Sequence, residues 1–337
     1  MAATTLPNEL RPRRLAARAA RVALLIAALV LAALLAPGLD GVRDQLGDAD
    51  GTWLALAGGL ELLSCAAYVA MFRPIFCRAM SWRTSAEIGG AELGMGSVVP
   101  ASGIGGLALG AWILHRRGMD AARIARRSVA FFLIKSSINF AAVAIIGALL
   151  ATSLVGPDLS LALTALPAAM SVALIALVAT LPKIGRGTAG GRVARVRRAI
   201  VDGVTEARAI FRSPDPLIAA GALGYWAFDN AVLYATFEAV GDAPSIWVVL
   251  LGYLIGQLGG LLPIPGGVGG IDGGLIGTLV VYGAPAETTA AAVLAYRLIL
   301  FWLPLAIGAL SLGALSRSVS DPRRRDLQAC TPIPADA

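Results

Sequence analysis

The sequence predicts an all-α integral membrane protein with six transmembrane helices and two re-entrant, broken hairpins in inverted-topology repeats. Three observations support this prediction: long apolar runs, two apolar regions broken by proline and glycine, and an uneven distribution of basic residues. Of the 337 residues, 57% are hydrophobic and only 15% are charged, whereas soluble domains have about 25% charged residues. An apolar run of about 20 residues matches the ~30 Å hydrocarbon layer of a bilayer.

Six apolar runs are long enough to be transmembrane helices. The first begins with an arginine-rich segment and so resembles a signal peptide, but the charge distribution of the whole chain favours a retained helix. Arg18 and Arg21 can extend it by reaching toward the headgroups. The runs lie at 15–36, 52–72, 128–152, 159–181, 217–240 and 288–314. The predicted division is a cytoplasmic arm at 1–14, a single transmembrane domain at 15–315 and a cytoplasmic tail at 316–337.

Two further apolar regions, 88–114 and 246–283, are interrupted by proline and glycine at 98–106 and 261–270. A helix with such residues loses backbone hydrogen bonds, and in lipid the freed groups must be satisfied by protein or by a wet cavity. Each interruption therefore indicates the tip of a re-entrant hairpin, or a discontinuous helix, inside the bundle.

The basic residues predict the orientation. Of the 28 Lys and Arg residues, 25 lie in five basic segments, and the segments between them that are expected outside are acidic. The segments expected outside carry several Asp and Glu residues but only one arginine, Arg43. The positive-inside rule then places both termini in the cytoplasm of a multi-pass protein of the cytoplasmic (inner) membrane. The basic segments lie at 11–21, 73–83, 116–127, 183–212 and 317–325.

The two halves of the chain share a pattern. Val-Val-Pro-x-x-Gly at 98–103 matches Leu-Leu-Pro-x-x-Gly at 261–266, and each motif is soon followed by Gly-Gly. The prolines of the two motifs lie 163 residues apart. The orientation inverts the second half relative to the first, which predicts repeats at 15–152 and 159–315. Inverted repeats with paired broken helices are typical of transporters, whose binding site lies where the repeats meet.

Lys135 and Arg297 are the two cations placed well inside predicted spans, and they lie 162 residues apart. Counted from opposite faces, each lies roughly 12–15 Å deep. A charge there costs about 2.5–3.5 kcal/mol on insertion scales, so it pairs or faces water. One interpretation is that both cations converge on an anionic headgroup. The other is that they form internal salt bridges, for example with Glu61 or Asp229.

The broken regions offer a second anion-binding element, because the first turn of each returning helix has free backbone N–H groups. Gly252, Gly256 and Gly277 lie outside these interruptions, and we expect them only to allow close packing of helices. The predicted substrate-binding set is Lys135, Arg297, Gly103, Gly105, Gly106, Pro263, Pro265, Gly266, Gly267, Gly269, Gly270 and Asp272. The acids that can partner the cations, bind a cationic headgroup or carry protons are Glu61, Glu92 and Asp229.

Several classes of site are disfavoured. With three cysteines and one histidine, no disulfide framework, metal site or cofactor is expected. The Gly-x-Gly-x-x-Gly pattern at 185–190 lacks the βαβ context of a dinucleotide site. No nucleophile–base set is visible, so enzymatic activity is not expected. The basic stretch 183–212 indicates an amphipathic segment near anionic lipid rather than a nucleic-acid site.

The motif Pro263-Ile-Pro265-Gly-Gly-Val-Gly, in a hydrophobic hairpin before the last span, resembles the flippase-like transmembrane region of lysylphosphatidylglycerol synthases. The resemblance covers approximately residues 15–315. It implies a protein that translocates lipids with modified headgroups. Bifunctional members also carry a soluble C-terminal synthase domain, which we expect to be absent here because the chain ends shortly after its last span. Aminoacyl transfer is therefore not implied.

The chain departs from the family pattern at both breaks. Where the second break commonly continues into an Arg-Glu pair, this chain has Ile271 and Asp272. Where the first commonly carries an Arg and a Glu, it has Ser102 and Gly106. The family's usual lipid specificity is therefore not carried over.

The pattern as a whole predicts a lipid flippase-like transporter that moves a phospholipid or a lipid-linked anionic intermediate between leaflets. Its expected partners are membrane lipids with anionic headgroups; nucleic acid is not expected, and a homo-oligomer is compatible with the sequence. Two alternatives stay open: an integral-membrane enzyme acting on lipid headgroups, and an ion-coupled carrier of small solutes.

Overall fold

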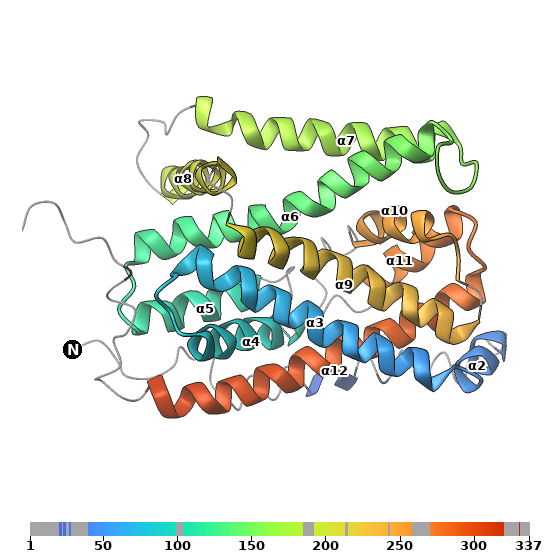
Figure 1. Ribbon diagram of the computed structural model, residues 1–337, viewed down its shortest axis with the longest axis horizontal. Helices are drawn as coiled ribbons and strands as arrows, with labels where there is room; N and C mark the ends of the chain where they lie inside the picture. Colours follow the sequence, from blue (N-terminus) through green and yellow to red (C-terminus); the bar gives the residue numbers. More distant parts are fainter. Residues whose placement is uncertain are drawn as a thin grey trace, which may run out of the picture.

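In this computed structural model, α-helices and one short 3-10 turn make up the regular structure of the described residues (Figure 1). The structure describes residues 20–21, 23–24, 27, 40–98, 104–184, 192–212, 215–241, 243–257, 270–319 and 330. The helices are α2 (Asp40–Gly47), α3 (Gly51–Phe76), α4 (Trp82–Val98), α5 (Ile104–Arg116), α6 (Ala121–Ala151), α7 (Leu161–Thr180), α8 (Arg192–Arg212), α9 (Pro216–Val240), α10 (Ile246–Gln257), α11 (Gly270–Val281) and α12 (Ala286–Val319).

Acidic N-caps begin three of the long helices. Asp50, Asp120 and Asp215 precede α3, α6 and α9, and each carboxylate accepts a hydrogen bond of 2.7–2.9 Å from a backbone N–H of the first turn. These caps satisfy N–H groups that have no partner within the helix. At the other end of α9, Gly241 adopts a φ of 110°, which favours glycine and stops the helix.

Four described helices are long and apolar enough to cross a membrane, and they match four of the predicted spans. They are Gly51–Phe76, Ala121–Ala151, Leu161–Lys183 and Ala286–Leu315. The 25-residue α9 coincides with the predicted span 217–240 but is not among these four. Polar residues such as Asp229 and Asn230 lower its apolar content. The predicted first span lies almost wholly outside the described residues, so the count of six stays a prediction.

The two interrupted apolar regions form two pairs of short helices. In the first pair, α4 ends at Val98 and α5 begins at Ile104; in the second, α10 ends at Gln257 and α11 begins at Gly270. The connections at 99–103 and 258–269 lie outside the described residues. Figure 1 shows the two pairs at opposite ends of the bundle, α4 and α5 on the left and α10 and α11 on the right. The predicted interruptions therefore separate real helices, and each pair occupies one end only.

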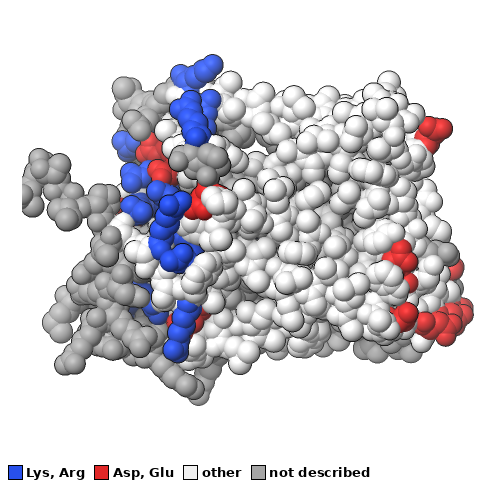
Figure 2. Space-filling view, viewed as in Figure 1, with Lys and Arg blue, Asp and Glu red and all other residues white. Residues whose placement is uncertain are grey.

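Charged side chains gather at the two ends of the bundle. In Figure 2, viewed as in Figure 1, Lys and Arg form a band at the end that holds α4, α5 and α8, whereas the opposite end carries Asp and Glu. The wide surface between them is almost free of charge. An uncharged band with a basic end is the surface expected of a protein that spans a bilayer.

The amphipathic helix α8 lies at the basic end. Figure 1 shows it nearly end-on, across the direction of α6 and α7. Val201, Val204 and Ala207 are buried, and Arg127 of α6 forms a 2.8 Å ion pair with Glu206. Basic residues on the other face, such as Arg198, are exposed. Residues 192–212 of the predicted amphipathic segment are thus a helix docked on α6.

Helices α4 and α12 cross at two facing glycines. A Cβ atom at Gly94 would lie 2.6 Å from Gly308 Cα and 2.9 Å from the carbonyl oxygen of Pro304. Both of these neighbours are backbone atoms, which cannot rotate away as a side chain can. The crossing therefore depends on small residues, as close helix contacts in membranes commonly do.

The glycines of the second pair give a mixed result. Gly252 and Gly256 pack as predicted, since Cβ atoms there would lie 2.7 Å from atoms of Leu279 and Leu275. The packing predicted at Gly277 is not found among the described residues, since none of them lies within 4 Å of a Cβ built there. Gly277 is on the exposed face of α11, which a repeat of small residues every four positions does not reveal.

Cys77 and Cys330 form a disulfide, with Cα atoms 5.8 Å apart. This corrects the expectation that no disulfide joins the three cysteines. The two residues are 253 positions apart in the sequence, and only the folded chain brings residue 330 to the end of α3. Cys65 is a free, buried thiol in the middle of α3.

The orientation can be tested with single cysteines in a cysteine-free background. Asp158 is exposed at the acidic end and Arg198 on α8 at the basic end. We expect Asp158→Cys to react with an impermeant maleimide on intact cells, and Arg198→Cys only after permeabilisation. Labelling of Arg198→Cys from outside would contradict the predicted orientation.

The glycine crossing predicts a strong local sensitivity. Gly94→Ala should lower the free energy of unfolding by about 1–3 kcal/mol, because the methyl group meets backbone on α12. Gly59→Ala on α3 is the matched control, since no atom of the described part of the chain lies within 4 Å of a Cβ there. Thermal unfolding of the two variants in detergent measures the difference. Equal melting temperatures would show that α4 and α12 are not held this closely.

Candidate functional site

Lys135 and Arg297, the two predicted intramembrane cations, lie on α6 and α12, the long helices that follow the two short pairs. Their surroundings differ. Arg297 is buried, with 9% of its surface exposed, whereas Lys135 is only partly buried. The two cations are therefore not equivalent in the structure, although the sequence places them at matching positions.

Arg297 forms an ion pair with Asp272, in which Nε donates to Oδ1 over 2.6 Å. Asp272 is 3% exposed and lies in the first turn of α11, where a carboxylate also complements the helix dipole. Glu61 and Asp229 were the partners named from the sequence. The correction is that the acid paired directly with Arg297 is Asp272, a residue predicted to bind substrate.

Lys135 lies between two tyrosines. Its Nζ is 5.3 Å from the ring centroid of Tyr225 and 5.9 Å from that of Tyr68, within range of a cation–π interaction. The carboxylates of Asp229 and Glu92 also act on it electrostatically. Aromatic faces and carboxylates together compensate for placing the ammonium group inside the bundle.

Glu92 connects the first short pair to the site. The hydroxyl of Tyr68 donates a 2.8 Å hydrogen bond to Glu92 Oε2, while Oε1 is buried and has no hydrogen-bond partner among the described residues. Across the pair, Gly106 and Gly110 of α5 face Glu92 so closely that a Cβ at either would collide with it. These glycines let α5 approach the acid, so Gly106 at least has a packing role.

Asp229 of α9 accepts hydrogen bonds from two tyrosine hydroxyls, that of Tyr253 on α10 and, at 3.1 Å, that of Tyr296 on α12. Glu61 interacts with it electrostatically from α3. The thiol of Cys65 in turn lies 3.5 Å from Glu61 Oε1 and donates to it. Glu61 in α3 and Asp229 in α9 are therefore within electrostatic range as two like charges and not as a bonded pair.

These contacts make one continuous polar cluster in the interior of the bundle. Asp229 links its parts, because it interacts electrostatically with both Lys135 and Arg297. Within the described ranges, no three His, Cys, Asp or Glu side chains come together as metal ligands. We call the following residues the polar cluster: Glu61, Tyr68, Glu92, Lys135, Tyr225, Asp229, Tyr253, Asp272, Tyr296 and Arg297.

The predicted backbone sites at the breaks are described only in part. Gly105 lies in the first turn of α5 and is partly buried, and Gly270 is buried at the first position of α11. Both therefore lie in the first turn of a helix, and their role in binding stays a prediction. The residues Gly103, Pro263, Pro265, Gly266, Gly267 and Gly269 lie outside the described part of the chain.

The tyrosines were missed from the sequence. The chain has six, and four of them, Tyr68, Tyr225, Tyr253 and Tyr296, belong to the polar cluster. A buried tyrosine needs a partner for its hydroxyl group, so tyrosines in the middle of predicted spans, away from the membrane interface, are the signal that could have identified them.

Most of the chain matches the model of a known protein family. The family model described as the lysylphosphatidylglycerol synthase TM region matches residues 19–308, which is most of the chain. The chain belongs to this family. The match includes every helix that contributes to the polar cluster, and the chain is accordingly a multi-pass membrane protein.

Three proteins of Methanothermobacter thermautotrophicus, each described as a UPF0104 membrane protein, are similar to this family member over shorter segments. One is 28% identical over 130 residues, 38% of each chain. A second is 34% identical over 86 residues, 25% of this chain and 26% of the relative. The third is 39% identical over 88 residues, 26% of this chain and 25% of the relative. Each match thus spans well under half of the relative.

The ion pair makes a prediction about stability. Arg297→Met should lower the free energy of unfolding by about 3–5 kcal/mol, because it leaves the Asp272 carboxylate buried without its partner. Adding Asp272→Asn should recover most of the loss, since the uncompensated charge is then removed.

The matched control for the ion pair is Arg83→Met. Arg83 pairs with Glu87 at 3.0 Å, but 82% of its side chain is exposed, so the loss should be about 0–1 kcal/mol. Unfolding is measured for all variants in the same detergent. A double variant no more stable than Arg297→Met would show that the pair does not hold the bundle together.

Proposed function

We propose that this protein moves a phospholipid, or a lipid-linked anionic intermediate, between the two leaflets of the membrane. The observation that supports the proposal is the polar cluster, which brings two cations from different halves of the chain into the interior of an otherwise apolar bundle. Charges at this depth are costly and are characteristic of a pathway for a polar or ionic group.

Lys135 is the residue proposed to contact the headgroup first. It is only partly buried, and among the described residues its near neighbours include the rings of Tyr68 and Tyr225, contacts that an anionic partner could supplement. A phosphate is such a partner, because a lysine ammonium is a compact charge with three donors. Arg297 forms an ion pair with Asp272. We propose that it binds the headgroup later, when the phosphate replaces the Asp272 carboxylate as the partner of the guanidinium.

The placement of the short helix pairs fits alternating access. Each pair lies at one end of the bundle, and each contributes an acid to the polar cluster, Glu92 from α4 and Asp272 from α11. We propose that the two pairs open the cluster to opposite leaflets in turn, as in transporters built from inverted repeats. The acyl chains would stay in the surrounding lipid.

Family membership supports the same substrate class. The family is named for the membrane region of a synthase whose product is a modified phospholipid, and a protein that binds phospholipid headgroups is consistent with that name. The proposed orientation is the one predicted from the charges, with the basic end in the cytoplasm.

The experiment is a translocation assay with the purified protein in vesicles that contain phosphatidylglycerol with a fluorescent acyl chain. Lys135→Met should slow translocation at least about tenfold, which corresponds to ~1.4 kcal/mol on the barrier. Lys183→Met is the matched control, because Lys183 is exposed beyond the end of α7. Both variants should melt near the wild-type temperature.

The same vesicles separate the alternatives. An enzyme acting on headgroups would change the mass of the lipid, and a carrier of small solutes would leave the lipid in its original leaflet. Equal translocation by Lys135→Met and wild-type protein would remove Lys135 from the pathway. No translocation by the wild-type protein under any imposed gradient would overturn the proposal itself.

A further inference from the structure

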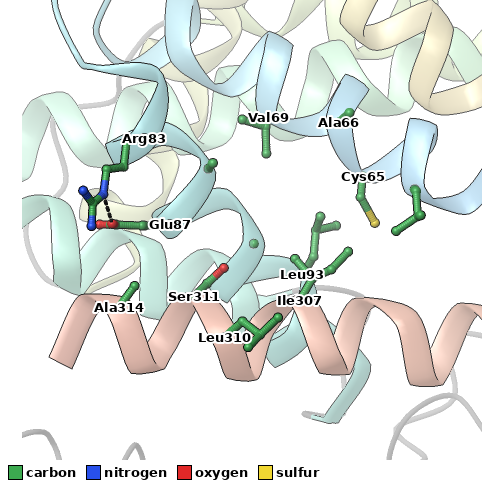
Figure 3. Close-up of a pocket in the computed structure, with 13 residues that line it drawn as sticks. Cys65, Ala66, Val69, Arg83, Glu87, Leu93, Ile307, Leu310, Ser311 and Ala314 are labelled. Carbon is green, nitrogen blue, oxygen red and sulfur yellow. Dashed lines mark hydrogen bonds and ion pairs between the residues drawn. The ribbon is translucent and has the colours of Figure 1, made fainter. Parts of the chain in front are cut away.

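An apolar groove of about 400 Å³ lies on the side of the bundle, between α3, α4 and α12. Figure 3 shows its lining side chains, with α12 along one edge and α3 along the other. Its lining includes Cys65, Ala66 and Val69 of α3 and Ile307, Leu310 and Ser311 of α12. None of the residues that line the groove belongs to the polar cluster.

One end of the groove is charged. Arg83 and Glu87 of α4 line it and form an ion pair, drawn as a dashed line in Figure 3. Glu87 also lies 3.5 Å from the guanidinium of Arg117, so two arginines lie beside this carboxylate. The Arg83 side chain is 82% exposed, so its guanidinium is accessible from outside the bundle.

The floor of the groove depends on the close crossing of α4 and α12. Gly90 lines the groove, and a Cβ there would collide with the Ser311 side chain and lie 3.1 Å from Ile307 Cγ2. Because Gly90 and Gly94 have no side chains, α12 packs directly against α4, and the side chains of Ser311 and Ile307 lie over Gly90 at the floor of the groove.

The groove therefore has the chemistry of a single lipid chain. Its wall is almost entirely apolar, and its charged end, with the exposed Arg83, lies at the basic end of the molecule, where anionic headgroups gather at a membrane surface. We infer that this groove binds one acyl chain of an anionic phospholipid, with the phosphate of that lipid at Arg83.

The position of Cys65 relates the groove to the polar cluster. Its side chain lines the groove, and its thiol donates to Glu61 of the cluster. One turn of α3 thus separates a bound acyl chain from the polar interior. This makes the groove the loading position of the transporter on its basic side, and that role, unlike lipid binding itself, rests on the proposed function.

Photolabelling tests the occupant directly. The full-length protein is reconstituted in phosphatidylcholine nanodiscs that contain a small fraction of phosphatidylglycerol with a diazirine on its acyl chain, and labelled peptides are mapped by mass spectrometry. We expect labelling to concentrate on the segments 62–69 and 307–314. The same diazirine on phosphatidylcholine should label these segments several-fold less, because it has no net charge to place at Arg83.

Two matched pairs of variants localise the effect. Ala66→Trp fills the groove and should reduce its labelling several-fold, whereas Ala309→Trp, exposed on α12 outside the groove lining, should not. Arg83→Gln should lower phosphatidylglycerol labelling to the phosphatidylcholine level. Arg78→Gln should not, although Arg78 is also an exposed arginine in an ion pair, with Asp215. Ala66 is itself exposed, so melting temperatures should stay close to wild type.

Three results would overturn the inference: uniform labelling of all apolar surfaces, labelling unaffected by Ala66→Trp, or a cross-link from a photoreactive residue at 66 to the predicted first span at 15–36 in place of lipid. The translocation assay is run on the same variants. Groove labelling without translocation would leave the lipid site standing and remove the proposed function. Translocation without groove labelling would remove the lipid site and leave the proposed function standing.

Discussion

The ion pair between Arg297 and Asp272 constrains this structure more than any other contact. A bilayer interior has no water to stabilise a lone charge, so a guanidinium in the middle of α12 needs an anion from another helix. Asp272 lies in the first turn of α11, so the pair determines where that short helix begins beside the long one. The hydroxyls of Tyr253 and Tyr296 bind Asp229 in the same region, which ties α9, α10 and α12 together.

In the first half of the chain, the charge of Lys135 inside the bundle is compensated in a different way from that of Arg297. Lys135 has aromatic rings beside it and carboxylates within electrostatic reach. One of these carboxylates, that of Glu92, accepts a hydrogen bond from Tyr68. The second half is therefore closed by a short, direct ion pair, and the first is held by longer-range attraction. A phosphate that enters the cluster at Lys135 would meet ring contacts there, whereas at Arg297 it would have to displace a direct ion pair of the described residues.

Much of this architecture is readable in the sequence. Proline and glycine at 98–106 and 261–270 mark where helices stop, because they remove backbone hydrogen bonds, and both cations stand out in apolar runs. The partner of Arg297 could not be read in the same way. Asp272 is 25 positions away, across a turn whose geometry the sequence does not determine, and several other acids are equally plausible by spacing. The Cys77–Cys330 pairing is hidden for the same reason.

The contact of Gly94 with Gly308 has a consequence for the relatives of this protein. Because both residues meet through backbone atoms, a larger side chain at either position forces the two helix axes apart by the thickness of that side chain. In another family member, the size of the residues at these two positions therefore predicts the distance between the two helices. Members with two small residues should keep these helices in close contact, and members with a bulky residue should have them farther apart.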